Sequence, residues 1–134
     1  MKLEPINPTS LGAPRGFSHG ILAPANARLL FVAGQIGNRD GAVTVVPGGF
    51  VPQFEQALAN VLTVVRAAGG TPEQVTRLTI YVTDREAYLA ALADVGAAYR
   101  RQMGRHYPAM ALLAIHGLVV AEAMVEIEAT AVVP

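Results

Sequence analysis

The feature that most constrains the fold of this chain is a pair of segments whose apolar residues recur every three or four positions. The segments span residues 50–68 and residues 85–103. Side chains at this spacing share one face of a helix, so each segment is predicted to be an amphipathic helix that must bury one stripe. Gly69-Gly70 provides a stop after the first helix, and Asp84 is placed to cap the second.

The remaining apolar stretches are predicted to be strands. Residues 75–82 alternate between apolar and polar side chains, which is typical of a strand with one buried face. Residues 29–33 form a compact apolar run that is too short for a helix and is predicted to be a buried strand. Four further strands are expected, in residues 1–16, 17–23, 110–115 and 124–132.

The resulting element order, β-β-β-α-β-α-β-β, predicts a single two-layer α+β domain over residues 1–134, with one sheet packed by two helices. The helices need the same face of the sheet, so no helix remains to cover the opposite face. At 52% hydrophobic and 15% charged residues, the chain is apolar for a soluble domain. We therefore expect other subunits to bury the second sheet face.

The hydrophobic residues are not arranged for a membrane. No run approaches the ~18 uninterrupted apolar residues of a spanning helix, and the N-terminus lacks the apolar core of a signal peptide. We expect no membrane partner, and the cytoplasm is the default location.

The charged and metal-binding residue types exclude several classes of function. Ten basic and ten acidic residues cancel, so no overall field attracts nucleic acid. The absence of cysteine excludes thiolate metal sites and cysteine nucleophiles. The three histidines, His19, His106 and His116, lack the spacing of metal ligands. We expect neither a metal nor another cofactor.

Several short motifs follow one another along nearly the whole chain. Gly16-Phe17-Ser18-His19 and Gly34-Gln35-Ile36 lie near the front, and Tyr107-Pro108-Ala109 and Glu126-Ile127-Glu128-Ala129 lie near the end. Each motif alone is weak, but together their order and spacing resemble the RidA/YjgF family of small trimeric enamine/imine deaminases. The resemblance implies a chorismate-mutase-like fold and a homotrimer with a small-molecule cleft at every subunit interface.

The resemblance also implies roles for particular residues. Gly34, whose loop offers a backbone amide, and Glu126 on the last strand correspond to the catalytic groups that place the attacking water. Met110 occupies the position of the arginine that binds the substrate carboxylate. Phe17 stands where the family has a tyrosine, and Leu112 stands where a cysteine is often found.

These replacements all make the expected cleft more apolar. Methionine supplies neither the charge nor the paired donors with which a guanidinium grips a carboxylate. Phe17 keeps an aromatic ring without the hydroxyl. We therefore expect a small, largely apolar or neutral ligand, bound by Phe17, Met110 and Leu112 together with Ser18 and His19 of the same cleft-side segment.

Three functions remain open on the sequence. The first is a trimeric protein that binds such a ligand, with hydrolysis of an imine or enamine undecided. The second is an orthodox 2-iminobutanoate/2-iminopropanoate deaminase in which Arg105 or Arg15 replaces the lost arginine. The third is a non-catalytic binding or chaperone-like module.

Glu126 itself has two interpretations. It is either a cleft carboxylate whose pKa rises in apolar surroundings or a structural glutamate that is paired or solvated.

Overall fold

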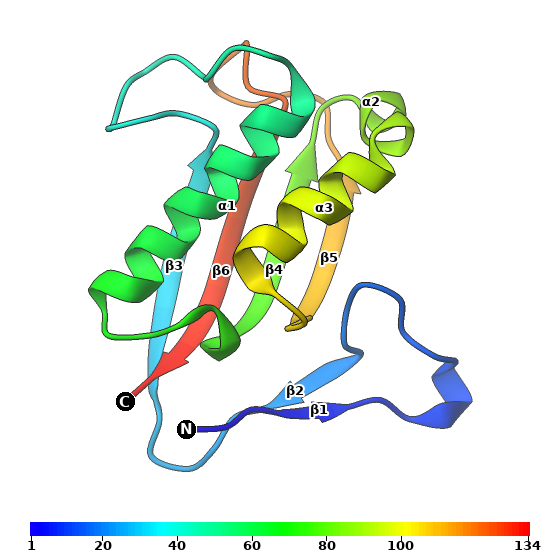
Figure 1. The fold of residues 1–134 in the computed structure, drawn as a ribbon, viewed down its shortest axis with the longest axis vertical. Coiled ribbons are helices and arrows are strands. Elements are labelled where there is room, and N and C mark those ends of the chain that lie inside the picture. Colours follow the sequence, from blue (N-terminus) through cyan, green and yellow to red (C-terminus); the bar gives the residue numbers. More distant parts are fainter.

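The computed structural model describes residues 1–134, and its helices and strands follow the predicted order (Figure 1). Two short 3-10 turns, Thr9–Leu11 and Pro72–Gln74, join the regular elements. The elements are β1 (Glu4–Ile6), β2 (Gly20–Leu22), β3 (Arg28–Ile36), α1 (Phe50–Ala67), β4 (Val75–Val82), α2 (Arg85–Ala90), α3 (Leu92–Met103), β5 (Ala109–Ala114) and β6 (Val125–Val133).

The strands form a four-stranded sheet of order β3-β6-β4-β5 and a separate two-stranded hairpin, β1-β2. β6 pairs antiparallel with both β3 and β4, whereas β4 and β5 run parallel. A parallel pair needs a long crossover connection, and the segment with α2 and α3 supplies it. In Figure 1 both α1 and α3 lie across the same face of the sheet. This arrangement confirms the two-layer α+β class.

The hydrophobic core lies between the two helices and that face of the sheet, in one cluster of 20 buried residues. The predicted stripe of α1 is buried in it, including Phe54, Leu58 and Val61. On β4 and β6 every second side chain enters the core, as the alternation predicted. None of the helices has the length and apolarity that crossing a bilayer demands.

The second predicted helix is in fact two helices, so the prediction of one helix over residues 85–103 is wrong. Ala91 leaves the helical conformation with φ −110° and ψ 15°, and α3 starts directly after it. Tyr88 then packs edge-to-face on Phe50, with ring centroids 6.1 Å apart. Leu92, one of the apolar residues of the segment predicted to be a single amphipathic helix, is 52% exposed. The break accompanies this contact with the first residue of α1, and no residue near Ala91 signals it.

The strand predicted in residues 29–33 exists, but it is not buried within the chain. Leu29 is 63% exposed and Phe31 is 74% exposed, while Val32, the residue after Phe31, enters the core. The reason is that β3 is an edge strand, and α1 covers only one of its faces. The strand predicted in residues 17–23 is also shorter, because β2 begins at Gly20.

The cap predicted for the second helical segment is confirmed and can be tested. The Asp84 carboxylate accepts a 2.9 Å hydrogen bond from the Ala87 backbone N–H. Asp84→Ala is expected to lower the free energy of unfolding by about 1 kcal/mol, because the Ala87 N–H at the start of the helix would lose its hydrogen-bond acceptor. Urea unfolding measures the loss. Asp94→Ala, an exposed residue without such a bond, serves as the control and should change stability by less than about 0.5 kcal/mol.

Candidate functional site

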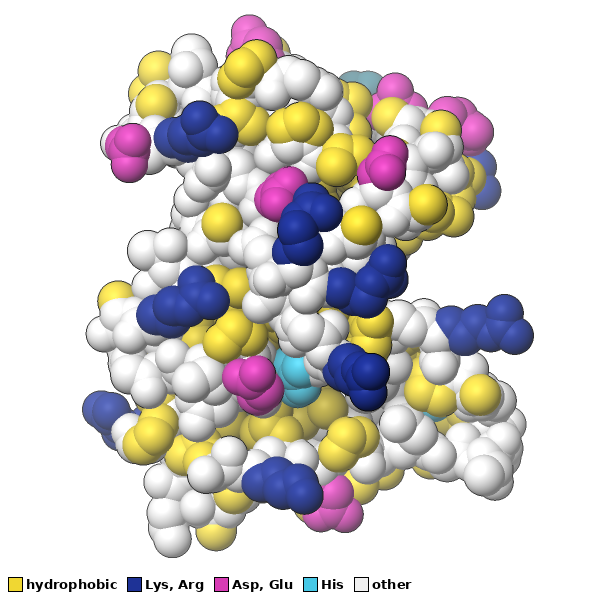
Figure 2. Space-filling view, viewed as in Figure 1, with side chains coloured by type: hydrophobic (Ala, Val, Ile, Leu, Met, Phe, Trp, Pro, Cys, Tyr) yellow, Lys and Arg dark blue, Asp and Glu magenta, His cyan; other side chains and the backbone are white.

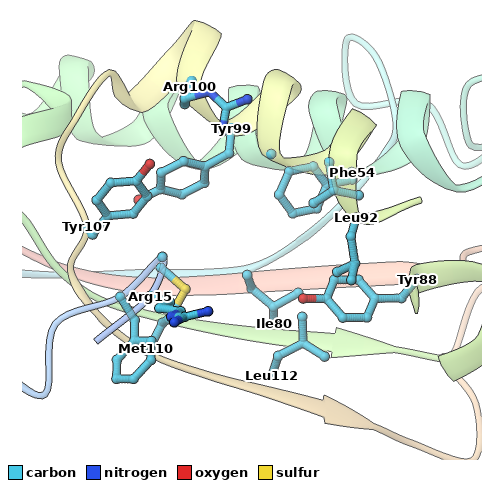
Figure 3. A pocket seen from close by; sticks show the side chains of 14 residues that line it. Arg15, Phe54, Ile80, Tyr88, Leu92, Tyr99, Arg100, Tyr107, Met110 and Leu112 are labelled. Atoms are coloured by element: carbon cyan, nitrogen blue, oxygen red, sulfur yellow. The ribbon is translucent and has the colours of Figure 1, made fainter. Parts of the chain in front are cut away.

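An apolar cavity with a volume of about 340 Å³ lies between α3 and β5 (Figure 3). Residues 15–17 of the N-terminal segment contribute to its wall. Ten of its fourteen lining residues are hydrophobic, and these include Phe17, Met110 and Leu112, three of the residues predicted to bind ligand. The apolar lining of this part of the site therefore agrees with the sequence.

Strand geometry places Met110 and Leu112 in this cavity. They pair with Leu78 and Ile80 on the parallel neighbour β4, so all of these side chains point to the helix-covered face of the sheet. Because β5 is the edge strand, its side chains are less completely covered than those of β4. Met110 is half-buried and Leu112 is 37% exposed.

Ser18 and His19 do not line the cavity; they attach the segment that carries Phe17. The Ser18 backbone N–H donates to the Pro108 carbonyl at 3.0 Å, and its hydroxyl donates to the Tyr107 carbonyl at 2.5 Å. The His19 ring lies against Phe17 in an edge-to-face contact of 5.2 Å. These contacts hold Phe17 beside the start of β5.

Glu126 and Gly34 lie together on the opposite face of the sheet. Glu126 and Glu128 alternate with buried residues along β6, so they point away from the helices. The β3–β6 register shifts between Val32 and Gln35, which places Gly34 at an irregularity of the edge strand. A Cβ atom at Gly34 would lie 2.8 Å from Cδ of Glu126. The missing side chain of Gly34 therefore provides the space that the Glu126 carboxylate occupies.

The two glutamates on this face differ in their partners. The Tyr81 hydroxyl donates a 2.8 Å hydrogen bond to Glu128, and this bond raises the pKa of Tyr81, since ionisation would remove the donor and place two negative charges together. Glu128 is therefore a paired structural carboxylate. The side-chain carboxylate of Glu126 has no hydrogen bond or ion pair within the chain.

Within one chain, the predicted site is divided between the two faces of the sheet. Phe17, Met110 and Leu112 border the cavity on the helix side. Gly34 and Glu126 lie on the uncovered side. A cleft that contains both groups requires residues from more than one chain.

Two arginines line the cavity, and only one was a candidate in the sequence. Arg15 and Arg100 both border it, whereas Arg105 does not. The signal that could have identified Arg100 is its place one helical turn after Gly96, on the face that also carries Tyr99. No group of three or more histidine, aspartate or glutamate side chains is arranged to hold a metal ion.

A pair of tyrosines forms one wall of the cavity. The rings of Tyr99 and Tyr107 stack with centroids 5.3 Å apart and an interplanar angle of 7°. The Tyr99 hydroxyl donates to the His106 carbonyl at 2.6 Å, and burial raises the pKa of Tyr99 above its ordinary value. Tyr99 thus stays neutral and presents an aromatic surface to a ligand.

Comparison with known proteins supports the resemblance seen in the sequence. Residues 8–133 match the family model described as Endoribonuclease L-PSP. The 2-iminobutanoate/2-iminopropanoate deaminase of Capra hircus is 32% identical over 105 residues, which cover 78% of this chain and 73% of the relative.

Solved structures show the same fold. The Rid-family protein YyfB from Yersinia pestis superimposes with a TM-score of 0.82 at 37% identity, covering 99% of this chain and 100% of that one. TdcF from E. coli, solved with bound serine, superimposes with a TM-score of 0.66 at 26% identity and covers 92% of each chain. By its sequence match over nearly its whole length and by its fold, this chain belongs to the RidA/YjgF family.

Proposed function

We propose that this protein is a cytoplasmic homotrimer that binds a small metabolite with a largely apolar body in clefts between its subunits, and that it hydrolyses an imine or enamine there. The cavity beside β5 carries this proposal, because it brings Phe17, Met110 and Leu112 together in an apolar lining. Relatives that bear the name 2-iminobutanoate/2-iminopropanoate deaminase supply the reaction class.

The uncovered face of the sheet supports the trimer. Leu29 and Phe31 expose large apolar side chains on it, although α1 and α3 cover the other face. Exposed apolar surface of this kind favours association, because burial removes it from water. An interface on this face would also bring Gly34 and Glu126 of one subunit toward a neighbouring chain.

Glu126 is suited to the chemistry of imine hydrolysis. The carboxylate would accept a proton from water as the water oxygen bonds to the imine carbon. It would return that proton to the nitrogen to give a carbinolamine, and would then carry the hydroxyl proton to the nitrogen as the carbon–nitrogen bond breaks, leaving a ketone and ammonia. The lack of any partner for Glu126 within the chain leaves its oxygens free for both transfers.

An orthodox 2-iminobutanoate/2-iminopropanoate deaminase is the second candidate. Arg15 lines the cavity and so offers a guanidinium that could bind the substrate carboxylate. Arg105 does not line it, which makes Arg15 the first of the two predicted replacements to test. Imines made in situ by an amino-acid oxidase, with release of the keto acid followed over time, test both candidates on the purified protein.

Gly34→Ala tests the placement of Glu126. The added Cβ would lie 2.8 Å from Cδ of Glu126, which is the far end of a flexible side chain, so the protein should fold and the carboxylate should move. Hydrolysis of the best imine substrate is expected to fall by about a factor of 100 or more, because a shift of about 1 Å in a catalytic group has such an effect. Initial rates and thermal melts measure the two effects. Unchanged rates would contradict the role of Glu126.

We also propose that RNA is not a substrate, although the matching family model is described as an endoribonuclease. Figure 2 shows acidic side chains mainly at the upper end of the helix-covered face and separate basic side chains over its middle and lower part, which do not join into one continuous stripe. Such a stripe is the usual requirement for tracking a phosphate backbone. Incubation with labelled single-stranded RNA should leave it intact, and cleavage above that of a Glu126→Ala control would refute the expectation.

A further inference from the structure

The end of β3 that carries Gly34 is paired with the sheet through only two residues. The β3–β6 register shifts at this point, and past the shift Gln35 pairs with Ile127 and Ile36 pairs with Glu126. β3 is an edge strand, so it has no neighbour on its other side within the chain. A strand end with an irregular register and two pairs is easily displaced, so further contacts must set its position.

The backbone and the carboxylate of Glu126 are fixed by different elements. The backbone belongs to β6, which pairs with β3 on one side and β4 on the other. The Gln53 amide, 4% exposed, anchors the start of β6: it accepts a 2.8 Å hydrogen bond from the Met124 N–H and donates to the Glu122 carbonyl at 3.2 Å. The carboxylate instead rests against the bare backbone of Gly34. Its position therefore follows the end of β3.

Asn60 on α1 contacts that strand end from the helix-covered side. Its Nδ2 donates to the Ile36 carbonyl at 3.0 Å and to the Asn38 carbonyl at 2.8 Å, so the amide joins the last residue of β3 to the loop that follows. Gln56 donates to Oδ1 of Asn60 at 2.9 Å, which fixes the orientation of the amide and directs Nδ2 to the two carbonyls. Since Ile36 pairs with Glu126, Asn60 holds the direct neighbour of the proposed catalytic residue.

The backbone of the chain also approaches α1 closely at this point. A Cβ atom at Gly37, the residue after β3, would lie 2.6 Å from Cα of Gln53 and 2.6 Å from its carbonyl oxygen. Only glycine allows this approach, by which α1 packs directly on the chain as it leaves β3 (Figure 1). The Asn60 amide therefore acts at a closely packed contact between helix and strand.

From these contacts we infer that Asn60 is a positioning residue for Glu126. Asn60 touches no reacting atom. By holding Ile36 it fixes the end of β3, and with it the backbone at Gly34 on which the Glu126 carboxylate rests. The inference rests on the proposed hydrolysis, in which that carboxylate transfers protons. It gives α1, which lies on one face of the sheet, a role in the chemistry on the other face.

Steady-state kinetics of Asn60→Ala on the best imine substrate test this role. The kcat is expected to fall about ten- to a hundredfold while KM changes less than about threefold, because a displaced catalytic group slows the chemical step and the apolar cavity beside β5 is untouched. Gln56→Ala, which frees the Asn60 amide to rotate, should lower kcat by a smaller factor. Gln102→Ala is the matched control: its amide also donates between elements, to the Glu55 carbonyl at 2.8 Å, but that bond joins α3 to α1. Its kcat should be unchanged.

Carbon-13 NMR of the glutamate carboxyl groups gives a measurement that does not depend on turnover. The carboxyl signal of Glu126, assigned with Glu126→Gln, should shift in Asn60→Ala and stay in place in Gln102→Ala. The backbone N–H groups at the end of β3 should also exchange with deuterium at least about tenfold faster in Asn60→Ala alone, because a strand end that opens exposes them to water.

The outcomes separate this inference from the proposed function. If imines are hydrolysed but Asn60→Ala keeps its kcat, or Gln56→Ala does so where Asn60→Ala does not fold, Asn60 has no positioning role. An equal loss in Gln102→Ala, or an unmoved Glu126 carboxyl signal in Asn60→Ala, overturns the inference as well. If the unsubstituted protein hydrolyses no imine, the proposed function fails, and the carboxyl signal alone decides whether Asn60 sets the position of Glu126.

Discussion

Replacing Met110 with arginine is expected to raise the turnover of 2-iminobutanoate by roughly 1.5 to 3.5 orders of magnitude. The position lies on β5 in the cavity that Phe17 and Leu112 also line, and methionine supplies no cation of its own for a substrate carboxylate. A close guanidinium–carboxylate contact is worth about two to five kcal/mol, and each 1.36 kcal/mol changes a rate tenfold. The oxidase-coupled imine assay compares Met110→Arg directly with the unsubstituted protein.

The half-buried setting of Met110 makes this variant realistic. The cavity opens to solvent, so a long side chain can keep its charged end hydrated while its stem packs on apolar surface. Arg15 lies on the same side in Figure 3, and the substitution should therefore also be made with Arg15→Gln, which removes repulsion between like charges. Thermal melts of both proteins establish first that they fold.

Glu126→Ala provides the control for the Met110→Arg experiment. On the Met110→Arg background it should abolish the gained hydrolysis, because no carboxylate would remain to take the proton from water. A folded Met110→Arg protein that neither binds 2-ketobutyrate nor hydrolyses imines would show that this cavity is not a modified deaminase site. High turnover before any substitution would instead favour Arg15 as the existing anchor.

Phe31→Asp is expected to convert the proposed trimer into monomers. The side chain is 74% exposed in the single chain, so the substitution should leave the monomer fold intact. In a trimer built on this sheet face, each subunit would lose about 1.5–3 kcal/mol of aromatic burial and would also have to bury a carboxylate. Because the change repeats in every subunit, dissociation should be complete at micromolar concentration.

Light scattering or sedimentation measures this change of mass. Val43→Asp is a suitable control, because Val43 is 83% exposed but belongs to the loop between β3 and α1 rather than to the sheet. It should leave the assembly unchanged. A monomeric unsubstituted protein would contradict the trimer and, with it, the inter-subunit cleft.

Local patterns in the sequence were enough to predict the element order, whereas the candidate site residues followed from the family resemblance and stay a prediction. The stripe of α1, the alternation of β4 and β6, and the cap at Asp84 depend on residues within a few positions of one another. The alternation of apolar and polar residues along β6 likewise puts Glu126 and Glu128 on one face and Ile127 in the core. Motif order identified the family, which the comparisons confirmed.

The features that only the tertiary structure decided all depend on contacts between distant segments. The exposure of Leu29 and Phe31 follows from the edge position of β3, which results from its pairing with β6 at the other end of the chain. The break at Ala91 accompanies packing of Tyr88 on Phe50. No local pattern specifies such pairings, because strand order and helix placement are settled by the total burial of the assembled core.

The same distinction applies to charge and to the two halves of the site. Arg100, Arg101 and Arg105 are close in the sequence and carry the same side chain. Only packing in the fold gives them different surroundings: Arg101 pairs with Glu55, Arg100 lies over Gly96, and Arg105 lies outside the cavity. Sequence determined that Met110 and Glu126 belong to strands. The pairing of those strands decided that the two side chains face opposite sides of the sheet, because a side chain's face depends on strand register, which is a property of the folded sheet.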